Sequence, residues 1–229
     1  MLTDAERKAY DQARTAAVAE LSGPSTDGRG RFAALAALTR LRQLACHPRL
    51  VDPASELPSS KLARLMTLVR DLRTTKQRAL LFSQFTQHLA LVREALDEAG
   101  FGYLYLDGQT PAEERARRVE AFQEGDIGLF LISLKAGGTG LTLTGADTVI
   151  HLDPWWNPAV EDQATDRAHR IGQTKPVTVY RLVARATIEE AIVQLHESKR
   201  ELVAQVLGGT QTASNLSTDE LIDLIRTGG

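Results

Sequence analysis

The sequence predicts a doubly wound α/β fold, in which helices flank a parallel sheet and an N-terminal helical appendage precedes it. Compact apolar runs at 79–82, 129–132 and 148–152 are typical of buried strands. Between them lie stretches whose apolar residues recur with the helical period. Strands that alternate with helices form parallel sheets with right-handed crossovers. Such sheets carry ligand-binding loops at the carboxyl ends of their strands.

The N-terminal part is predicted to form two helices. Residues 3–21 begin with a capping box, in which Thr3 and Glu6 satisfy each other's backbone amides. Residues 31–46 carry leucines at helical spacing along one side. We expect residues 1–58 as a whole to form a helical segment that links the sheet domain to another lobe upstream in the polypeptide.

The predicted sheet domain covers residues 59–207, and a linker with a short helix covers residues 208–229. Capping boxes are expected at Thr110, Thr187 and Ser217, because a glutamate follows each of them three residues later. The predicted elements are, in order, helix 60–74, strand 79–82, helix 87–99, strand 103–106, helix 110–124, strands 129–132 and 148–152, a helix from 159, strand 177–183, helix 187–207 and a helix from 217.

The composition excludes several classes of protein. The chain has 229 residues, 43% of them hydrophobic and 24% charged, which is a globular composition. No apolar run reaches the roughly 20 residues that a membrane span needs, and the polar N-terminus is unlike a secretory signal. The single cysteine, Cys46, permits no intramolecular disulfide and indicates a reducing compartment. Because no second pair of ligands follows Cys46 and His47, we expect no metal site.

A loop after the first predicted strand has the character of a phosphate seat. Ser83, Gln84 and Thr86 join that strand to a helix N-terminus, where free amides and the helix dipole favour an anion. The alternative is that Thr86 only caps the helix, and the residues alone favour neither interpretation. The net charge of −2 argues against a uniformly basic nucleic-acid binder but allows local sites of this kind.

Residues 133–140 form a second loop of this kind, between two buried strands. Adjacent glycines let a backbone approach a phosphate closely, and Lys135 can add a positive charge. The alternative is a flexible connector. The candidate residues of this loop are Ser133, Lys135, Gly138, Thr139 and Gly140.

Two tryptophans, Trp155 and Trp156, follow the strand at 148–152 and lie between prolines. Aromatic side chains usually fill hydrophobic space. Two in succession cannot both point inward from a strand end, so we expect one to be buried and one to be accessible.

The helix from residue 159 is expected to carry Gln163, Arg167 and Arg170 on one face, because spacings of four and three match the helical repeat. Such arginines can reach across a cleft to phosphates that another lobe holds. The alternative is a solvated, charged face in which the arginines pair with nearby acidic residues.

Residues 163–173, QATDRAHRIGQ, follow a strand and a Trp-Asn-Pro turn. In this context they resemble the sixth motif of Swi/Snf-type DNA-dependent ATPases, a branch of the superfamily-two helicases. The glycine-rich loop resembles the fifth motif, and LLFSQF at 80–85 the fourth. A looser similarity runs from about residue 38 to residue 207. The resemblance implies a RecA-like fold and the C-terminal lobe of an ATP-dependent double-stranded DNA translocase or remodeller.

The resemblance also implies roles for individual residues. Those expected to contact DNA are Ser83, Gln84, Thr86, Ser133, Lys135, Gly138, Thr139 and Trp156. Catalytic roles fall on Gln163, Arg167 and Arg170, the two arginines acting as fingers that stabilise the transferring phosphoryl group. Gly140 and Asp166 are expected to couple the lobe to the ATP side.

The sequence contains neither a GxxxxGK[ST] phosphate loop nor an acidic DExx box at a strand end. We therefore expect the lobe that holds ATP and Mg²⁺ to lie upstream in a longer polypeptide. This chain alone should bind no cofactor and should not hydrolyse ATP. The implied partners are double-stranded DNA, the N-terminal helicase lobe of the same polypeptide and a nucleoprotein or polymerase target. No membrane partner is expected, and the protein should be a monomer.

Two other functions stay open, a non-catalytic DNA- or protein-binding module and an RNA helicase lobe. Gln163, Arg167 and Arg170 disfavour the first, because a pure binder has no use for phosphate-facing arginines. The Trp-Asn-Pro turn and the Ile-Gly-Gln ending of the sixth motif fit the duplex-DNA branch better than an RNA helicase. The compact lobe favours a bacterial protein that is cytoplasmic and nucleoid-associated, whereas a eukaryotic one would be nuclear.

Overall fold

The computed structural model describes residues 1–22, 29–136, 141–169, 173, 175–205 and 217–228, with only the backbone for residues 29 and 197–205. Contacts between Cα atoms divide the chain into two compact units. We call residues 62–155 and 159–182 the sheet unit, and residues 1–61, 156–158 and 183–229 the helical unit. None of the described helices is long and apolar enough to cross a membrane.

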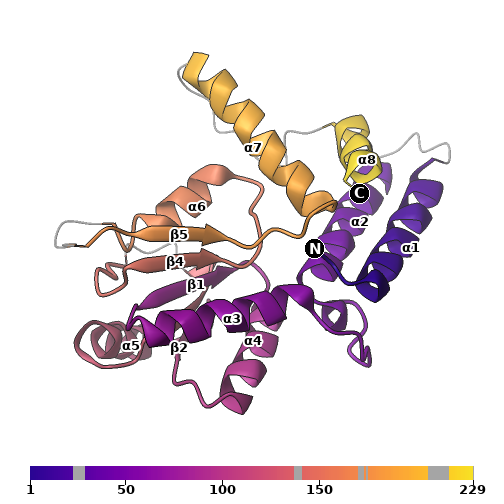
Figure 1. Cartoon of the computed structure of the whole chain (residues 1–229). Helices are drawn as coiled ribbons and strands as arrows, with labels where there is room; N and C mark the ends of the chain where they lie inside the picture. Colours follow the sequence, from indigo (N-terminus) through magenta and orange to yellow (C-terminus); the bar gives the residue numbers. More distant parts are fainter. Residues whose placement is uncertain (23–28, 137–140, 170–172, 174, 206–216, 229) are drawn as a thin grey trace. The chain divides into compact units, whose positions relative to one another are not determined.

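The sheet unit contains five parallel strands in the order β2-β3-β1-β4-β5 (Figure 1). β1 pairs with both β3 and β4, so that Ser83 lies opposite Ser133 and Phe82 lies opposite His151. The predicted parallel, doubly wound sheet is therefore confirmed. The strands span Ala79–Ser83 (β1), Leu104–Leu106 (β2), Leu129–Ser133 (β3), Thr148–His151 (β4) and Thr178–Arg181 (β5).

Helices cover both faces of the sheet. They are α3 (Ser60–Thr74), α4 (Thr86–Glu98), α5 (Ala112–Glu124) and α6 (Pro158–Thr165). α3 and α4 pack on the face that carries Leu81 and Ile150, whereas α5 and α6 pack on the face that carries Phe82 and Val149. Neighbouring residues of a strand thus point to opposite apolar layers, which explains the continuous apolar runs in the sequence.

The two edge strands, β2 and β5, are shorter than predicted. The strand expected at 103–106 begins at residue 104, and the one expected at 177–183 spans only residues 178–181. All four residues of β5 are exposed. An edge strand pairs on one side only, so fewer of its residues are held in the ladder.

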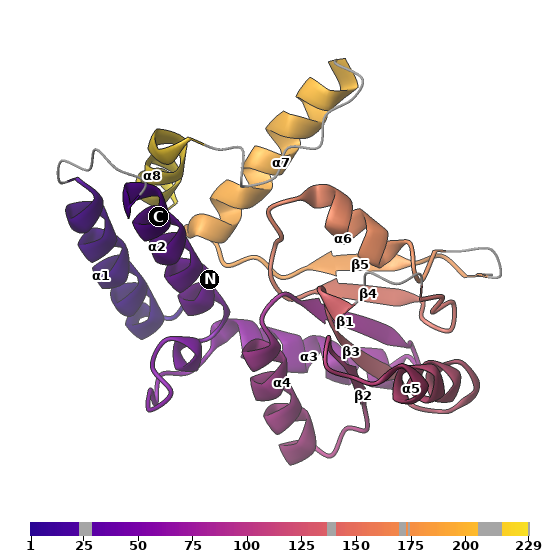
Figure 2. The ribbon, with the colours of Figure 1, turned by 180° about the vertical axis from the view of Figure 1, so that it is seen from behind.

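The helical unit consists of α1 (Asp4–Leu21), α2 (Arg29–Cys46), the short 3-10 helix η1 (Pro48–Leu50), α7 (Ile188–Gln205) and α8 (Thr218–Thr227). α1, α2 and α8 lie side by side and share an apolar core with the first turns of α7 (Figure 2). Tyr10 is fully buried in this core, where its hydroxyl donates to the Gly228 carbonyl (3.0 Å) and accepts from the Ile188 N–H (2.7 Å). Burial raises the pKa of Tyr10 to about 12, so the phenol keeps the proton that it donates.

A buried ion pair links three segments of the helical unit. Lys61 Nζ lies 2.5 and 2.6 Å from the two carboxylate oxygens of Glu189, and the two side chains are 5% and 0% exposed. The same carboxylate accepts the Ala184 N–H at 2.8 Å and lies 3.5 Å from the Cys46 thiol. The pair therefore joins the first turn of α3 to the end of α2 and the start of α7.

The capping boxes at Thr3 and Ser217 are confirmed. At Thr187 both bonds are displaced by one residue, since the Thr187 hydroxyl accepts the Glu189 N–H at 3.2 Å and Glu190 accepts the Ala186 N–H at 2.8 Å. The one expected at Thr110 is wrong, because α5 follows Pro111 with no side-chain cap. The Thr110 hydroxyl instead donates to the Asp107 carboxylate at 3.1 Å and accepts the Asp107 N–H at 3.1 Å. Asp and Thr side chains readily bond to nearby backbone in this way, and here the hydrogen bonds between Thr110 and Asp107 form in place of a helix cap.

The contacts group α7 with α1, α2 and α8. The boundaries suggested by the sequence, 1–58, 59–207 and 208–229, place that helix with the sheet instead. A functional division of the chain at those positions stays a prediction.

Candidate functional site at the carboxyl edge of the sheet

The loops singled out from the sequence meet at one edge of the sheet. Ser83 and Ser133 end the neighbouring strands β1 and β3 at the same level, and Asp153 follows β4 on the other side of β1. Because all of these strands are parallel, their carboxyl ends face the same side (Figure 1). This is the edge at which doubly wound sheets bind ligands.

Ser83 and Ser133 lie beneath this edge rather than on it. Their side chains are 0% and 2% exposed. The Ser83 hydroxyl donates to the Asp153 carboxylate, which also accepts the Gln84 N–H at 3.3 Å. Ser83 therefore fixes the loop after β1 to the loop after β4 in this structure, and direct contact of either serine with DNA stays a prediction.

The N-terminus of α4 is open to solvent. Phe85 occupies the cap position and makes no side-chain capping bond, so the amides of the first turn have no side-chain acceptor at the cap. Thr86 is the first residue of the helix and is exposed, and the alternative in which it caps the helix is wrong. Gln84 beside it is half-buried. Uncapped amides and the helix dipole together favour an anion at this position.

The loop after β3 presents one cation at the edge. Lys135 is exposed, whereas its neighbours Leu134 and Ala136 are buried. The Leu134 N–H donates to the Ser83 carbonyl at 2.9 Å, and Arg115 Nη1 donates to the Ala136 carbonyl at 3.2 Å. These bonds hold the base of the loop and leave the Lys135 ammonium facing solvent. Gly138, Thr139 and Gly140 lie outside the described residues.

The expectation that one tryptophan is buried and the other accessible is wrong, because both are half-buried. Trp155 packs against the apolar layer of the sheet unit beneath α5 and α6. Trp156 packs in the helical unit, where the Arg42 guanidinium lies 5.1 Å from its ring centroid. Each side chain has its own apolar layer, which is why neither is left to solvent. A role for Trp156 in DNA contact stays a prediction.

The helix expected to carry Gln163, Arg167 and Arg170 on one face ends too early to do so. α6 stops at Thr165, and Arg167 lies in the turn that follows. Gln163 is exposed, whereas Arg167 is only 4% exposed, with its guanidinium 5.8 Å from the ring centroid of Phe82. The predicted common face of Gln163 and Arg167 is therefore wrong. Arg170 lies outside the described residues, and Asp166 is exposed.

Gln173, to which the sequence analysis gave no role, holds this turn in place. Its side-chain amide nitrogen lies within hydrogen-bond distance of the carbonyls of Thr144 (3.0 Å), Ala146 (2.7 Å) and Ala168 (3.1 Å). In addition, the Leu143 N–H donates to the Arg167 carbonyl at 2.9 Å. These bonds tie the segment after the glycine-rich loop to the segment after α6. The only sequence signal for Gln173 is its place at the end of the sixth motif.

Glu161 is a second residue of this site whose role the sequence did not reveal. It is 1% exposed, and its carboxylate accepts the Trp155 N–H at 2.8 Å and Arg181 Nε at 2.8 Å. A buried carboxylate needs such partners to offset its lost hydration. Glu161 thus anchors the backbone of the tryptophan turn and joins α6 to β5.

Comparison with known proteins identifies the family. Residues 60–172 match the model of the helicase conserved C-terminal domain. The chain is 44% identical over 180 residues to the chromatin-remodeling ATPase INO80 of Cryptococcus neoformans, covering 77% of this chain and 10% of that one. It superposes on the C-terminal domain of the SWI2/SNF2 ATPase of Sulfolobus solfataricus with a TM-score of 0.79 at 28% identity, covering 100% of this chain and 96% of that one. The chain belongs to the Swi/Snf-type ATPases.

Within that family the chain corresponds to the C-terminal helicase lobe, and its RecA-like fold agrees with the solved structures. It also aligns with the S. solfataricus SWI2/SNF2 ATPase core in complex with double-stranded DNA. There the TM-score is 0.82 at 30% identity, and the match covers 100% of this chain and 49% of that one. The chain spans between 8% and 22% of the length of the curated relatives that it matches.

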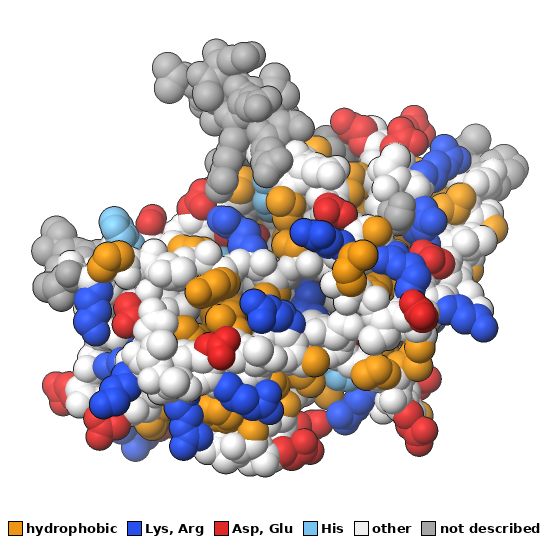
Figure 3. All heavy atoms as spheres, in the orientation of Figure 1, with side chains coloured by type: hydrophobic (Ala, Val, Ile, Leu, Met, Phe, Trp, Pro, Cys, Tyr) orange, Lys and Arg blue, Asp and Glu red, His pale blue; other side chains and the backbone are white. Residues whose placement is uncertain are grey.

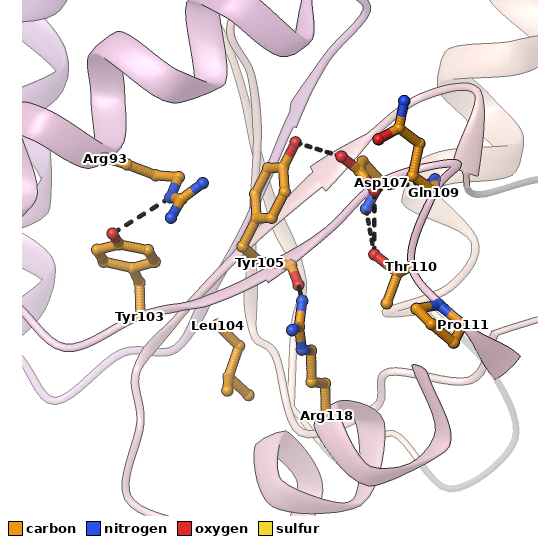
Figure 4. A pocket seen from close by; sticks show the side chains of 9 residues that line it. All are labelled: Arg93, Tyr103, Leu104, Tyr105, Asp107, Gln109, Thr110, Pro111 and Arg118. Carbon is orange, nitrogen blue, oxygen red and sulfur yellow. Dashed lines mark hydrogen bonds between the residues drawn. The ribbon is translucent and has the colours of Figure 1, made fainter. Parts of the chain in front are cut away.

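The Swi/Snf lobe has a pocket of about 520 Å³ along the edge strand β2 and the loop that follows it (Figure 4). The Tyr105 hydroxyl donates to Asp107 at 2.9 Å, and the Arg93 guanidinium lies 4.7 Å from the Tyr105 ring centroid. Arg118 donates to the Tyr105 carbonyl, and Thr110 bonds to Asp107. Most polar groups of the pocket thus bond to one another, and these hydrogen bonds fix the loop after β2.

The pKa values of Tyr105 and Asp107 reflect these hydrogen bonds. Burial, followed by the hydrogen bond to Asp107, raises the pKa of Tyr105 to about 12. Burial alone would raise the pKa of Asp107, but hydrogen bonds from Tyr105, Gln109 and Thr110 outweigh it and hold that pKa below its usual value. At neutral pH the tyrosine therefore donates and the carboxylate accepts.

His151, at the end of β4, should make the stability of the Swi/Snf lobe depend on pH. Its ring lies 5.8 Å from Phe82 and 3.1 Å from the Thr165 hydroxyl, and burial lowers its pKa from 6.5 to about 4. Between these two values only the unfolded chain binds the proton. Stability is therefore full above pH 6.5 and falls as the pH drops toward 4, by about 1.4 kcal/mol per pH unit.

Urea unfolding at about pH 7 and about pH 5.5 measures this effect. His151→Gln should flatten the dependence in that interval, whereas His169→Gln, at an exposed histidine, should leave it unchanged. Equal pH dependence in the His151→Gln protein and the wild type would contradict the assignment.

Proposed function

We propose that the chain is the C-terminal motor lobe of an ATP-dependent double-stranded DNA translocase or remodeller. One observation carries the proposal, the alignment of the whole chain with a SWI2/SNF2 ATPase core whose structure was solved in complex with double-stranded DNA. The carboxyl edge supports it, because the uncapped amides of α4 and the exposed Lys135 offer positive charge to a phosphate backbone. The proposed DNA contacts are Ser83, Gln84, Thr86, Ser133, Lys135, Gly138, Thr139 and Trp156.

In this proposal the lobe contributes to ATP hydrolysis without holding the nucleotide. ATP and Mg²⁺ are held mainly by the N-terminal helicase lobe of the same polypeptide, since this sequence has neither a phosphate loop nor an acidic box. Arg167 and Arg170 act as arginine fingers, assisted by Gln163, and stabilise charge on the transferring phosphoryl group. Gly140 and Asp166 couple that step to the DNA side.

The hydrogen bonds of Gln173 and Leu143 suggest how this coupling works. They connect the segment after the glycine-rich loop, on the DNA side, with the turn that carries Arg167, on the phosphate side. A displacement of one segment is therefore transmitted to the other through backbone carbonyls. Gln173 acts as a positioning residue in this scheme.

The macromolecules on which the lobe acts, and its place in the cell, are proposed from the family. We propose a monomeric lobe that acts on a nucleoprotein or polymerase target, in the cytoplasm and on the nucleoid of a bacterium, or in the nucleus if the protein is eukaryotic. An RNA helicase lobe and a non-catalytic binding module are the competing functions. Comparing ATP turnover of the two-lobed protein with duplex DNA, with RNA and with neither separates all three.

The isolated chain is expected not to hydrolyse ATP, because the groups that bind Mg²⁺ and the phosphates are absent from its sequence. Phosphate release should equal the buffer background with and without duplex DNA. Adding the N-terminal lobe should restore DNA-stimulated turnover. Turnover by the isolated chain that co-purifies with it and responds to DNA would refute the half-motor proposal.

DNA binding by the isolated chain is expected to be weak, salt-sensitive and indifferent to sequence, since phosphate contacts dominate affinity and carry no sequence information directly. Lys135→Ala should weaken binding about equally on all duplexes and reduce the salt slope by about 1. Arg117→Ala removes another exposed positive charge, one on α5 that pairs with Glu114, and serves as the control for net charge. Fluorescence anisotropy at several salt concentrations measures both, and a sequence preference that survives high salt would contradict the prediction.

A further inference from the structure

A second pocket lies at the opposite, amino-terminal edge of the sheet. It has a volume of about 630 Å³ and is lined by residues from the segments 69–73, 76–78, 100–102 and 125–129, among them Val69, Leu72 and Arg73 of the first, and all of these segments lie within the sheet unit. Leu72, Phe101 and Leu129 provide apolar wall. This volume suits the side chains of a short peptide or a small ligand. None of the roles proposed for the carboxyl edge uses it.

Cations gather around this apolar wall. Arg73 and Lys76 are exposed, Arg78 is half-buried, and all three line the pocket. The Arg73 guanidinium lies 5.0 Å from the Phe101 ring centroid, which holds it over the pocket wall. Among the described residues no carboxylate forms an ion pair with Arg73 or Lys76. Figure 3 shows basic and hydrophobic side chains side by side over the part of the sheet unit where α3 and α5 lie.

Lys76 occupies a backbone position that favours glycine. α3 ends with Gln77 N–H donating to the Leu72 carbonyl (2.9 Å) and Lys76 N–H to the Arg73 carbonyl (3.2 Å). This is a Schellman motif, in which the residue after the cap adopts a left-handed conformation. Lys76 has a φ of 54°, which is unusual for a residue with a side chain.

α4 ends in the same motif, and there the left-handed residue is a glycine. Phe101 N–H donates to the Leu96 carbonyl (2.9 Å) and Gly100 N–H to the Asp97 carbonyl (3.1 Å), with a φ of 67° at Gly100. Both motifs border the same pocket. Glycine satisfies the geometry without strain, so a lysine at residue 76 indicates that its side chain has a use. Complementing the negative end of α3 is one such use, and binding an anion is the other.

We propose that this pocket binds a short acidic peptide segment whose hydrophobic side chain enters the apolar wall while its carboxylates meet Arg73 and Lys76. Charge complementarity favours an acidic ligand, because Arg73, Lys76 and Arg78 line the pocket against one carboxylate, Asp126. The apolar wall favours a peptide over nucleic acid, since it can take a hydrophobic side chain and offers phosphates nothing. The segment belongs to a partner protein, and it docks away from the carboxyl edge.

A labelled hexapeptide, Asp-Glu-Leu-Phe-Glu-Asp, tests the proposal by fluorescence anisotropy with the complete chain in the absence of ATP and DNA. The peptide should bind saturably, and Lys-Arg-Leu-Phe-Arg-Lys should not. Lys76→Gly and Arg73→Ala should each weaken binding roughly two- to fivefold, as expected for one exposed ion pair. In a nitrogen-15 NMR titration, the amide signals of Lys76, Phe101 and Gly102 should shift.

Lys76→Gly keeps the test falsifiable, because glycine suits the backbone and the melting temperature should stay equal or rise. Arg117→Ala is the matched control for net charge and should not change the affinity for the peptide. Equal weakening by Arg117→Ala would reduce the effect to non-specific charge and overturn the proposal. Unchanged affinity in Lys76→Gly would assign the lysine to the helix end alone. If Lys76→Gly and Arg73→Ala weaken binding of duplex DNA but leave binding of the peptide unchanged, the surface belongs to nucleic acid and the proposal is overturned.

Discussion

Replacing Arg170 with alanine in the two-lobed protein is expected to lower DNA-stimulated ATP turnover by about a hundredfold or more, with folding and ATP binding nearly intact. An arginine finger acts chiefly on the transition state, so its loss affects turnover far more than affinity. Arg170→Lys should rescue little, because an ammonium cannot reproduce the planar, two-pronged contact of a guanidinium with phosphate. Steady-state turnover and nucleotide binding, measured on the same preparations, separate the two effects.

Arg167 provides an informative comparison, because it is buried over Phe82. Arg167→Ala should lower turnover and also lower the melting temperature, since it removes packed side-chain volume as well as charge. Arg167→Ala alone therefore does not separate catalysis from stability. Near-wild-type turnover in Arg170→Ala would remove the finger assignment. So would a fall of several degrees in the melting temperature of the isolated chain, which would make Arg170 a structural residue.

Glu189→Ala is expected to destabilise the helical unit by about 3–5 kcal/mol, because it leaves the Lys61 ammonium buried without its counter-ion. Both oxygens of Glu189 contact Lys61 Nζ, and a third hydrogen bond comes from the Ala184 N–H. The full loss should be visible in urea unfolding at neutral pH, followed by circular dichroism. Glu190→Ala, which removes only a bond to the exposed Ala186 N–H, is the matched control and should cost much less.

The double variant Lys61→Met, Glu189→Leu should recover much of that loss, because an apolar pair of similar volume needs no dehydration of charges. A cost below about 1 kcal/mol for Glu189→Ala would show that Lys61 finds water when its partner is removed, as exposed ion pairs do. The ion pair would then contribute little to holding α2, α3 and α7 together.

The sheet could be predicted from the sequence because its central strands are buried on both faces. β1, β3 and β4 therefore appear as continuous apolar runs, and the stretches between them show helical periodicity or turn residues. The edge strands β2 and β5 were placed less well, since an edge strand carries exposed residues and a weaker pattern. Local chemistry also misplaced the cap of α5, because Thr110 can bond either to the helix or to Asp107.

Much less of the candidate site could be predicted. Helical spacing placed Gln163 and Arg167 on one face, but the end of α6 depends on tertiary bonds such as that from the Leu143 N–H to the Arg167 carbonyl. Gln173 contacts carbonyls up to 29 residues away along the chain, and no local pattern encodes such partners. The burial of Ser83 likewise depends on Asp153, 70 residues further on. Spacing identifies which residue types are present at an edge, whereas their orientation depends on partners distant in sequence.

The alternation of the chain between its two units also decides where it can be cut. The chain passes from one unit to the other after residues 61, 155, 158 and 182. A fragment limited to residues 59–207 would keep α7 and remove α1, α2 and α8, so that Ile188 and Ile192 would face water. An apolar face uncovered in this way promotes aggregation. Truncations and gene fusions of this lobe therefore need to retain both terminal helical segments together, even when only the sheet is of interest.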